Sequence, residues 1–312
     1  MDLKIVKFRF YLKAEREIYL PEYKGAAFRG LFGTVFKSVA REMGFSEIYE
    51  YIFNTLNDGR LSDYSSPFAP KPFVLEAPLT DKRVFKPSEI FRLDFILTGR
   101  AINYAPALIF IFDEAGRSYG LGKWRSSGFG NYSLEKVTVV NENKEALYYQ
   151  PGIRQLSNII PDIGFDMVRP QKAESTLLII EFLTPTHIVR NGSAVEKNGT
   201  NPLSFEILIR SLYRRLYYLL YFHQSQDIPE FQPEPQVSGI KVLRKNLSWK
   251  RLYHYSNRQK TRVPLYGFTG SVVFKGFWQP FWPLLKLGEL LHIGKETTFG
   301  FGQYHLSSKS AV

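Results

Sequence analysis

The sequence contains no cysteine in its 312 residues. This absence excludes a disulfide framework, a thiolate zinc site, an iron–sulfur cluster and a cysteine nucleophile. Long apolar runs are missing as well, because the longest, residues 105–112, is far below the roughly 20 residues that a membrane-spanning helix needs. The N-terminal residues alternate charged and apolar side chains and lack the apolar core of a signal peptide. We therefore expect a cytoplasmic protein without a membrane partner.

Carboxylates are scarce in the second half of the chain. The sequence carries 41 Lys and Arg against 29 Asp and Glu, a net charge of +12, and residues 172–312 account for +9 of it, with 18 basic and 9 acidic residues. No carboxylate occurs between Glu234 and Glu289, and within that gap residues 241–262 interleave basic and aromatic side chains. Cations attract phosphates, and aromatic rings stack on unpaired bases. The segment therefore predicts an RNA or DNA partner; the alternative is a solvated basic loop that binds nothing.

Hydrophobic residues make up 44% of the sequence, and its length fits about two domains of roughly 150 residues each. Apolar residues recur at helical spacing from Phe28 to Val39 and predict a helix over residues 25–41. Gly30 and Gly33 lie off this stripe, and because each costs up to about 1 kcal/mol in a helix, we expect a closely packed backbone or a ligand beside them. The other predicted elements are a helix over residues 203–222, a helix or a strand over 105–112, and strands over 3–13, 91–98, 132–140, 176–183, 268–274 and 304–306.

A glycine-rich motif occurs twice. Residues 122–132 read GKWRSSGFGNY and residues 294–304 read GKETTFGFGQY, so both fit G-K-x4-G-F-G-x-Y without a gap, at an offset of 172 residues. Six shared identities at one spacing predict a duplicated domain. Glycines allow close backbone approach, and backbone N–H groups with a lysine can cradle a phosphate. The alternative is a structural turn before the last strand of each domain. Neither copy is a P-loop, because Trp124 and Glu296 follow the lysines where Ser or Thr is needed.

Several stretches match one known family. The closing stretch, residues 268–304, matches best, and LPEYKGAAFRGLFG at residues 20–33 is next. Thr184-Pro185, Arg214-Arg215 and HYSNRQ at residues 254–259 also match. On these residues the sequence resembles the RAMP superfamily of CRISPR-associated proteins, and within it the endoribonucleases that process CRISPR repeat RNA.

The resemblance implies an α+β fold of two tandem ferredoxin-like (βαββαβ, RRM-like) domains with antiparallel sheets. We place the N-terminal domain at residues 1–148, a polar, proline-containing linker at 149–174 and the C-terminal domain with its glycine-rich loop at 175–312. The resemblance also implies cleavage without a metal or cofactor, in which the ribose 2′-OH attacks the adjacent phosphate and leaves a 2′,3′-cyclic phosphate. Such a reaction needs a base near the 2′-OH, an acid near the 5′-oxygen and cations beside the phosphate.

The candidate catalytic residues are Lys37, Tyr23 and His292. Lys37 and Tyr23 flank or lie on the first helix, and His292 stands two residues before the glycine-rich loop. An imidazole is the side chain best suited to proton transfer near neutral pH, whereas a core or loop-capping role is the alternative for His292. We expect no metal site. The candidate RNA-binding residues are Arg29, Lys250, Arg251, His254, Arg258, Lys260, Arg262, Gly294, Lys295, Gly300 and Gly302.

The chain departs from the family at the first helix. Thr34 stands where many relatives have a catalytic histidine, and no histidine precedes His187. The first hypothesis is an endoribonuclease that cuts repeat RNA with other groups. The second is a non-cleaving RNA-binding subunit of a CRISPR effector complex, and the third is an assembly protein with a merely basic surface. The expected partners are repeat RNA, other effector subunits and a second copy of the chain.

Overall fold

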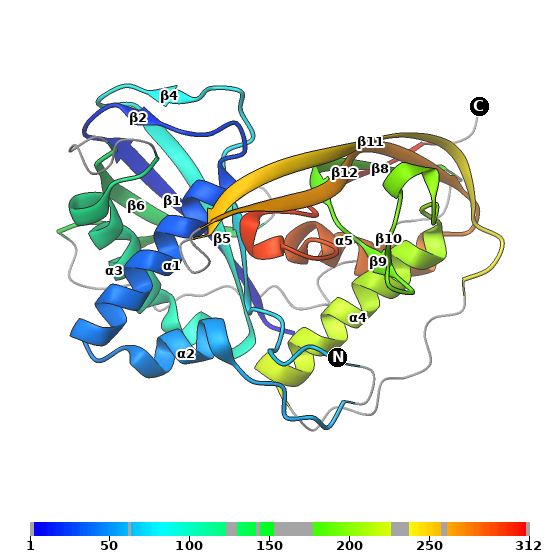
Figure 1. Ribbon diagram of the computed structural model, residues 1–312, viewed down its shortest axis with the longest axis horizontal. Helices are drawn as coiled ribbons and strands as arrows, with labels where there is room; N and C mark the ends of the chain where they lie inside the picture. The colour runs from blue at the N-terminus through cyan, green and yellow to red at the C-terminus, as the bar shows by residue number, and fades with distance from the viewer. Residues whose placement is uncertain are drawn as a thin grey trace.

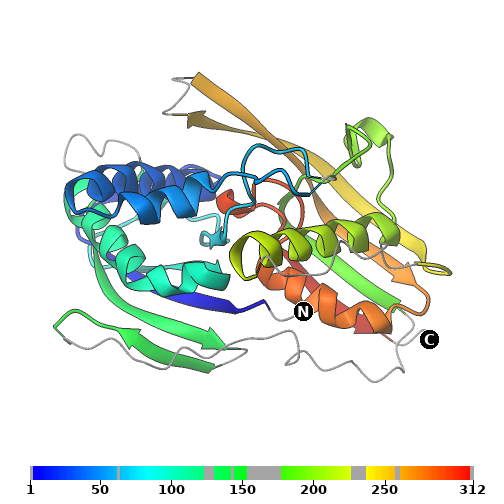
Figure 2. The same ribbon diagram turned by 90° about the horizontal axis from the view of Figure 1, so that it is seen from below.

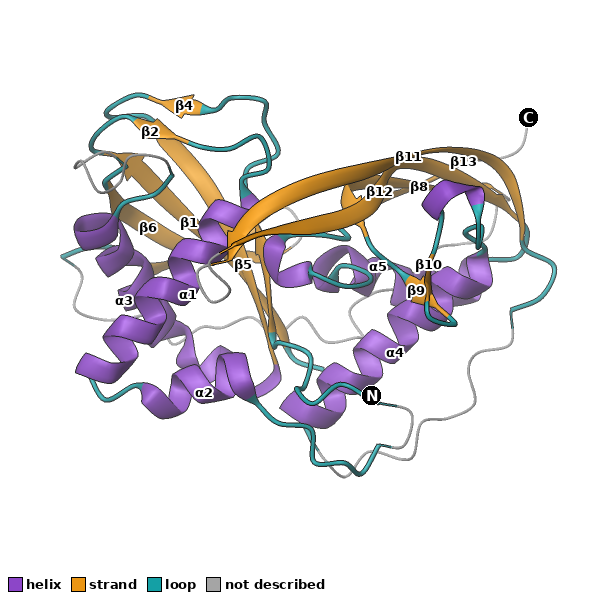
Figure 3. Ribbon diagram, in the orientation of Figure 1, coloured by secondary structure: helices purple, strands orange, loops and turns teal. Residues whose placement is uncertain are grey.

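The computed structural model describes residues 3–61, 64–122, 130–141, 144–152, 177–225, 237–256 and 261–309. Two large antiparallel sheets stand side by side, each with helices packed on one face (Figures 1 and 3). The first sheet has the strand order β3-β5-β1-β6-β7, and the second has the order β11-β12-β8-β13. No helix in the described part of the chain is long and apolar enough to cross a membrane.

The first unit forms around an aromatic core. The apolar stripe of helix α1, which includes Phe28, Phe32 and Phe36, is fully buried, so the spacing in the sequence correctly located the helix that covers the sheet (Figure 2). Residues 105–112, left open between helix and strand, are helical. The elements are β1 (Ile5–Ala14), β2 (Ile18–Tyr19), α1 (Gly25–Glu42), α2 (Ser46–Asn54), β3 (Phe73–Glu76), β4 (Val84–Phe85), β5 (Ile90–Thr98), α3 (Ala105–Glu114), β6 (Tyr132–Asn141) and β7 (Lys144–Tyr149).

The second unit repeats this plan. Helix α4 begins after Ser204, whose side chain accepts a hydrogen bond from the Ile207 N–H, and its long apolar face packs on the sheet. In both units the chain order strand–helix–strand–strand–helix–strand and the spatial order of the strands are those of a ferredoxin-like fold, as predicted. The elements are β8 (Leu177–Thr186), β9 (Val189–Arg190), β10 (Ser193–Ala194), α4 (Phe205–His223), β11 (Lys241–Ser256), β12 (Thr261–Lys275), α5 (Trp282–Leu291) and β13 (Tyr304–Lys309).

The offset of the glycine-rich repeat is also the offset of the strands. Adding 172 to the bounds of β1 gives those of β8, and β6 and β13 begin at the matching tyrosines. The loops close in the same way, because the Leu121 N–H donates to the Gly130 carbonyl at 2.8 Å and the Ile293 N–H donates to the Gly302 carbonyl at 3.0 Å. These glycines have positive φ angles, which favours glycine at both positions.

Two predicted segments differ from the structure. The strand predicted at residues 268–274 is the inner half of a much longer hairpin, β11–β12, which contains the basic segment. The polar run that precedes the predicted linker contains β7, which pairs with β6. Residues 153–174 of the predicted linker lie outside the described residues, so the domain boundaries stay predictions.

Candidate nucleic-acid interface

The second glycine-rich loop, residues 294–302, docks onto the first unit. The Tyr23 hydroxyl donates to the Phe299 carbonyl at 2.6 Å. A Cβ atom on Gly25 would lie 2.0 Å from that same carbonyl oxygen, and one on Gly300 would lie 2.7 Å from the Leu75 carbonyl oxygen. Backbone approaches this close require glycine. The loop is therefore a joint between the two units, packed against α1 on one side and β3 on the other.

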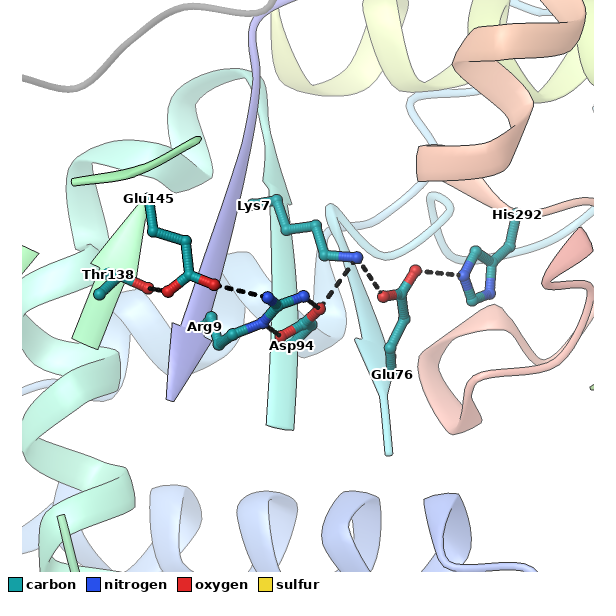
Figure 4. Close-up of polar contacts among 7 residues, drawn as sticks. All are labelled: Lys7, Arg9, Glu76, Asp94, Thr138, Glu145 and His292. Carbon is teal, nitrogen blue, oxygen red and sulfur yellow. Dashed lines mark hydrogen bonds and ion pairs between the residues drawn. The ribbon is translucent and has the colours of Figure 1, made fainter. Parts of the chain in front are cut away.

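A buried charged cluster fastens this joint (Figure 4). His292 Nε2 lies 2.9 Å from Glu76 Oε1, and Lys7 Nζ donates to Glu76 Oε2 at 2.5 Å. His292 Nδ1 lies 2.9 Å from the Phe301 carbonyl oxygen. Both ring nitrogens thus face acceptors, and both hydrogen bonds form together only when the imidazole carries two protons. We call Lys7, Glu76 and His292 the interdomain clasp.

Two properties of the clasp are unusual: the pKa of Glu76 and the backbone conformation of His292. Burial alone would raise the pKa of Glu76, but the hydrogen bond from His292 and the charge of Lys7 outweigh it and lower that pKa to about 2. His292 has φ 57° and ψ 170°, a region that is essentially reserved for glycine. Such strain persists only where the surroundings fix the residue, and here the two hydrogen bonds of the ring do so.

The clasp continues across the first sheet (Figure 4). Lys7 also pairs with Asp94 at 3.0 Å, Asp94 accepts two hydrogen bonds of 2.7 Å from Arg9, and Arg9 donates to Glu145 on β7 at 2.7 Å. Lys7 and Arg9 each bridge two of the three carboxylates in this chain, and the His292 ring contacts the carboxylate of Glu76. Every group has an opposite charge beside it, which is the condition for burying charges without a large penalty.

The three candidate catalytic residues lie in different surroundings. His292 is buried and Tyr23 is half-buried, and both side chains are hydrogen-bonded to the protein, so both have a packing role and their catalytic role stays a prediction. Both side chains hydrogen-bond to backbone carbonyls of the docked loop. Lys37 is exposed on α1, two turns beyond Arg29 on the same side of the helix.

The basic hairpin reaches the same joint. The hairpin pairs with β8 only from Phe268 onward, so its outer half, residues 249–256 and 261–267, projects past the sheet towards α1 (Figure 1). Near its end the His254 ring lies 5.0 Å from the ring of Phe299, and the Arg29 guanidinium carbon lies 5.7 Å from the same ring. Three predicted RNA-binding elements, the hairpin, the glycine-rich loop and α1, therefore meet at Phe299.

The remaining predicted RNA-binding residues divide into two groups. Lys250, Arg251 and Arg262 are exposed along the hairpin, whereas Arg258 and Lys260 lie outside the described residues. In the loop, the side chain of Lys295 is exposed, but the Lys295, Gly300 and Gly302 N–H groups donate to the His187, Thr297 and Pro185 carbonyls. These amides therefore have protein partners, and the turn predicted as the alternative explains Gly294, Gly300 and Gly302, whose φ angles are positive.

Thr184 on β8 holds the second glycine-rich loop in place through two hydrogen bonds, and this contact leads to a prediction about stability. Its buried hydroxyl donates to the Gly300 carbonyl at 2.7 Å and accepts from the Gln303 N–H at 2.9 Å. Thr184→Val keeps the shape and removes both bonds, so we expect it to lower the free energy of unfolding by about 1–3 kcal/mol. Urea denaturation measures this, with the exposed Thr200→Val as the control. A loss no larger than that of the control would mean that the two hydrogen bonds do not hold the loop.

The grouping of His292 with Glu76 and Lys7 was not predicted from the sequence, and neither was a role for Lys71. The sequence does contain a hint for Glu76, since a carboxylate in the otherwise apolar, fully buried strand FVLE needs a charged partner. It contains none for Lys71, because a lysine between two prolines is typical of an exposed loop. Among the described residues, no group of three or more His, Asp or Glu side chains could hold a metal ion.

The comparisons with known proteins agree with this architecture. The model of the AF_1859 N-terminal domain matches residues 3–159, half of the chain. The model of the CRISPR-associated endoribonuclease Cas6 matches residues 180–304, which contain the hairpin and the glycine-rich loop. An uncharacterized protein from Archaeoglobus fulgidus is 24% identical over 99% of both chains.

Solved structures share the fold at low sequence identity. Cas6 from Thermus thermophilus matches with a TM-score of 0.51 and 17% identity over 98% of this chain and 99% of its own. A partial Cas6-RT-Cas1–Cas2 complex matches with a TM-score of 0.58 and 12% identity, and there this chain spans 46% of the matched chain. The resemblance seen in the sequence to CRISPR repeat-processing endoribonucleases is confirmed by the Cas6 match over residues 180–304, and by its matched half the chain belongs to the AF_1859 family.

Proposed function

We propose that the protein binds and cleaves CRISPR repeat RNA to release guide RNAs, without a metal ion. The observation that carries this proposal is the contact between the basic hairpin and the glycine-rich loop, where His254 meets Phe299 within the region that the Cas6 model covers. An RNA strand that follows the basic hairpin arrives at the joint between the two units. There it meets an imidazole from the hairpin and cations from α1.

The proposed reaction is an internal displacement at phosphorus. The 2′-oxygen forms a bond to the phosphorus while the bond to the 5′-oxygen breaks, which leaves a 2′,3′-cyclic phosphate and a 5′-hydroxyl. The 2′-OH proton passes to a base, and the leaving 5′-oxygen takes a proton from an acid. His254 is the proton-transfer group that the geometry favours, and Arg29 and Lys37 supply positive charge along α1.

A second candidate function is RNA binding without cleavage. The observation that favours it is the occupation of Tyr23 and His292 by structural contacts, together with Thr34, whose hydroxyl donates to the Gly30 carbonyl at 2.8 Å on α1. In that role the protein would hold repeat RNA within a complex of CRISPR proteins. One of the solved structures that share the fold is such an assembly, a partial Cas6-RT-Cas1–Cas2 complex. Self-association into a dimer is a further proposal.

Incubation of the protein with repeat RNA in excess EDTA tests the proposal. We expect site-specific cleavage and a 2′,3′-cyclic phosphate end, with an unrelated RNA of the same length left uncut. A deoxyribose at the cleaved position should block the reaction, because it lacks the attacking oxygen. Tight binding of repeat RNA that returns intact would instead establish the non-cleaving role. Equal binding of both RNAs at physiological salt would reject both functions.

A further inference from the structure

Four cations, Arg29, Lys71, Arg100 and Arg215, lie where the two units approach each other, and two of them have oxygen partners. Arg100 donates to the Phe222 carbonyl at 3.2 Å, and Arg215 Nε donates to the Leu291 carbonyl at 2.7 Å. These carbonyls lie at the C-terminal ends of α4 and α5, where the helix dipole favours a positive charge. The positions of Arg100 and Arg215 are therefore explained within the protein.

Arg29 has no such partner. Its guanidinium carbon lies 4.6 Å from the ring centre of Phe53 and 5.7 Å from those of Phe73 and Phe299. Its Nε atom is buried and has no hydrogen-bond partner among the described residues. Burial lowers the pKa of Arg29 to about 10. The rings supply part of the missing stabilisation, but the buried Nε–H group still lacks an acceptor, which a bound anion would supply.

Lys71 is the second cation without an oxygen partner. It is half-buried, its Nζ lies 5.1 Å from the ring centre of Phe68, and within the described ranges it forms no ion pair. Arg29 and Lys71 are neighbours, because the Arg29 guanidinium carbon lies 5.7 Å from the ring centre of Phe73, two residues along the chain from Lys71. In agreement with this, burial and then the charge of Arg29 lower the pKa of Lys71 to about 8. Glu296 is the carboxylate that acts on Arg29, yet it is exposed and lies beyond ion-pairing distance. Two neighbouring cations without a counter-ion favour a bound anion.

We propose that Arg29 and Lys71 together bind one backbone phosphate of the RNA. This inference rests on the proposed function and adds Lys71 to its binding residues. A guanidinium can offer two parallel donors to phosphate oxygens, and an ammonium adds a point charge. Phe299 packs against both Arg29 and His254, so this phosphate belongs to the strand that the hairpin holds. A free phosphate ion has the same chemistry, and the experiment separates the two sources.

The test compares Lys71→Gln with Lys86→Gln, a change at an exposed lysine on the far side of the first unit. Repeat-RNA affinity is measured over a series of salt concentrations. We expect Lys71→Gln to weaken binding about 10-fold, as for one lost charged hydrogen bond, and to reduce the slope of log K against log salt by about one. Lys86→Gln should change neither quantity. Lys71→Arg, which keeps the charge, should restore both.

Each other outcome decides against the inference in its own way. If the native protein prefers repeat RNA and Lys71→Gln leaves affinity and slope unchanged, the phosphate site is rejected while the proposed function stands. If the native protein shows no preference, the proposed function fails first. If inorganic phosphate raises the melting temperature of the native protein more than that of Lys71→Gln while their RNA slopes agree, the site takes free phosphate, which overturns the assignment to RNA.

A pH series gives a second readout that needs only folded proteins. The native protein should bind repeat RNA more weakly as pH rises through 8, because Lys71 loses its charge there. Lys71→Arg should lack this loss between pH 7 and 9. Equal pH profiles for the two proteins would reject the inference even if Lys71→Gln failed to fold.

Discussion

Replacing His254 with alanine is expected to slow the cleavage of repeat RNA by about 10²–10⁴-fold, the range for losing a group that transfers a proton in the transition state. RNA affinity should fall by less than about 10-fold, because the cations along the hairpin remain. The reason is positional. His254 contacts Phe299 from the projecting hairpin, where the basic segment meets the glycine-rich loop, whereas His223 and His292 are fully buried.

Single-turnover cleavage with saturating enzyme measures the chemical step separately from binding. His305→Ala is the matched control, since His305 is exposed on β13 and pairs with Glu289 at 3.3 Å, away from the joint. We expect the control to cleave at the native rate. A His254→Ala protein that also cleaves at the native rate would remove His254 from the mechanism, and proton transfer would pass to another group such as Lys37. A fall in affinity alone would leave His254 as a binding residue.

The features that depend on local pattern could be predicted from the sequence. The stripe from Phe28 to Val39 predicted α1 to within one residue at its C-terminal end, because burial against a sheet imposes helical spacing. The repeat predicted the correspondence of β1 with β8, since a duplicated chain keeps its strand spacing. The resemblance to the RAMP superfamily then supplied the ferredoxin-like fold.

The hairpin could not be predicted in the same way. In β11 nearly every side chain is exposed or half-buried, so its residues show no alternation of polar and apolar positions. The strand forms because its backbone pairs with β12 along its length, and backbone pairing does not require a pattern of apolar side chains. The basic and aromatic composition identified the segment as a binding element without revealing its structure.

The interdomain clasp was hidden for a related reason. Glu76 and His292 are 216 residues apart, and neither lies in a motif that names the other. The spacing of His292 from the glycine-rich loop made it a candidate catalytic group, with a core or loop-capping role as the alternative. Its real surroundings depend on how the two units dock, and that docking follows from backbone approaches at Gly25 and Gly300.

The clasp leads to the largest expected change in stability. Glu76→Gln keeps the size of the side chain but removes the charge that faces Lys7 and His292. Because this breaks a buried ion pair, removing the carboxylate that faces His292 and one of the two that face Lys7, we expect the free energy of unfolding to fall by about 3–5 kcal/mol. Glu89→Gln is the matched control, since Glu89 pairs with Lys82 at 2.8 Å on the surface and should contribute no more than about 1 kcal/mol. Urea denaturation at pH 7 measures both.

The pH dependence of unfolding tests whether charge is the cause. The pKa of Glu76 is depressed from 4.5 to about 2 in the folded protein, so its contribution is complete above pH 4.5 and is lost as pH falls towards 2. Burial also lowers the pKa of His223, to about 4, so a second contribution is lost between pH 6.5 and 4 in the native protein and in Glu76→Gln alike. The stability difference between these two proteins should therefore hold from pH 7 to about 5 and shrink below pH 4.5. A difference that stays constant down to pH 3 would assign the effect of Glu76→Gln to packing. If the difference shrinks as expected, the joint that brings the hairpin, the glycine-rich loop and α1 together depends on the ionised carboxylate of Glu76.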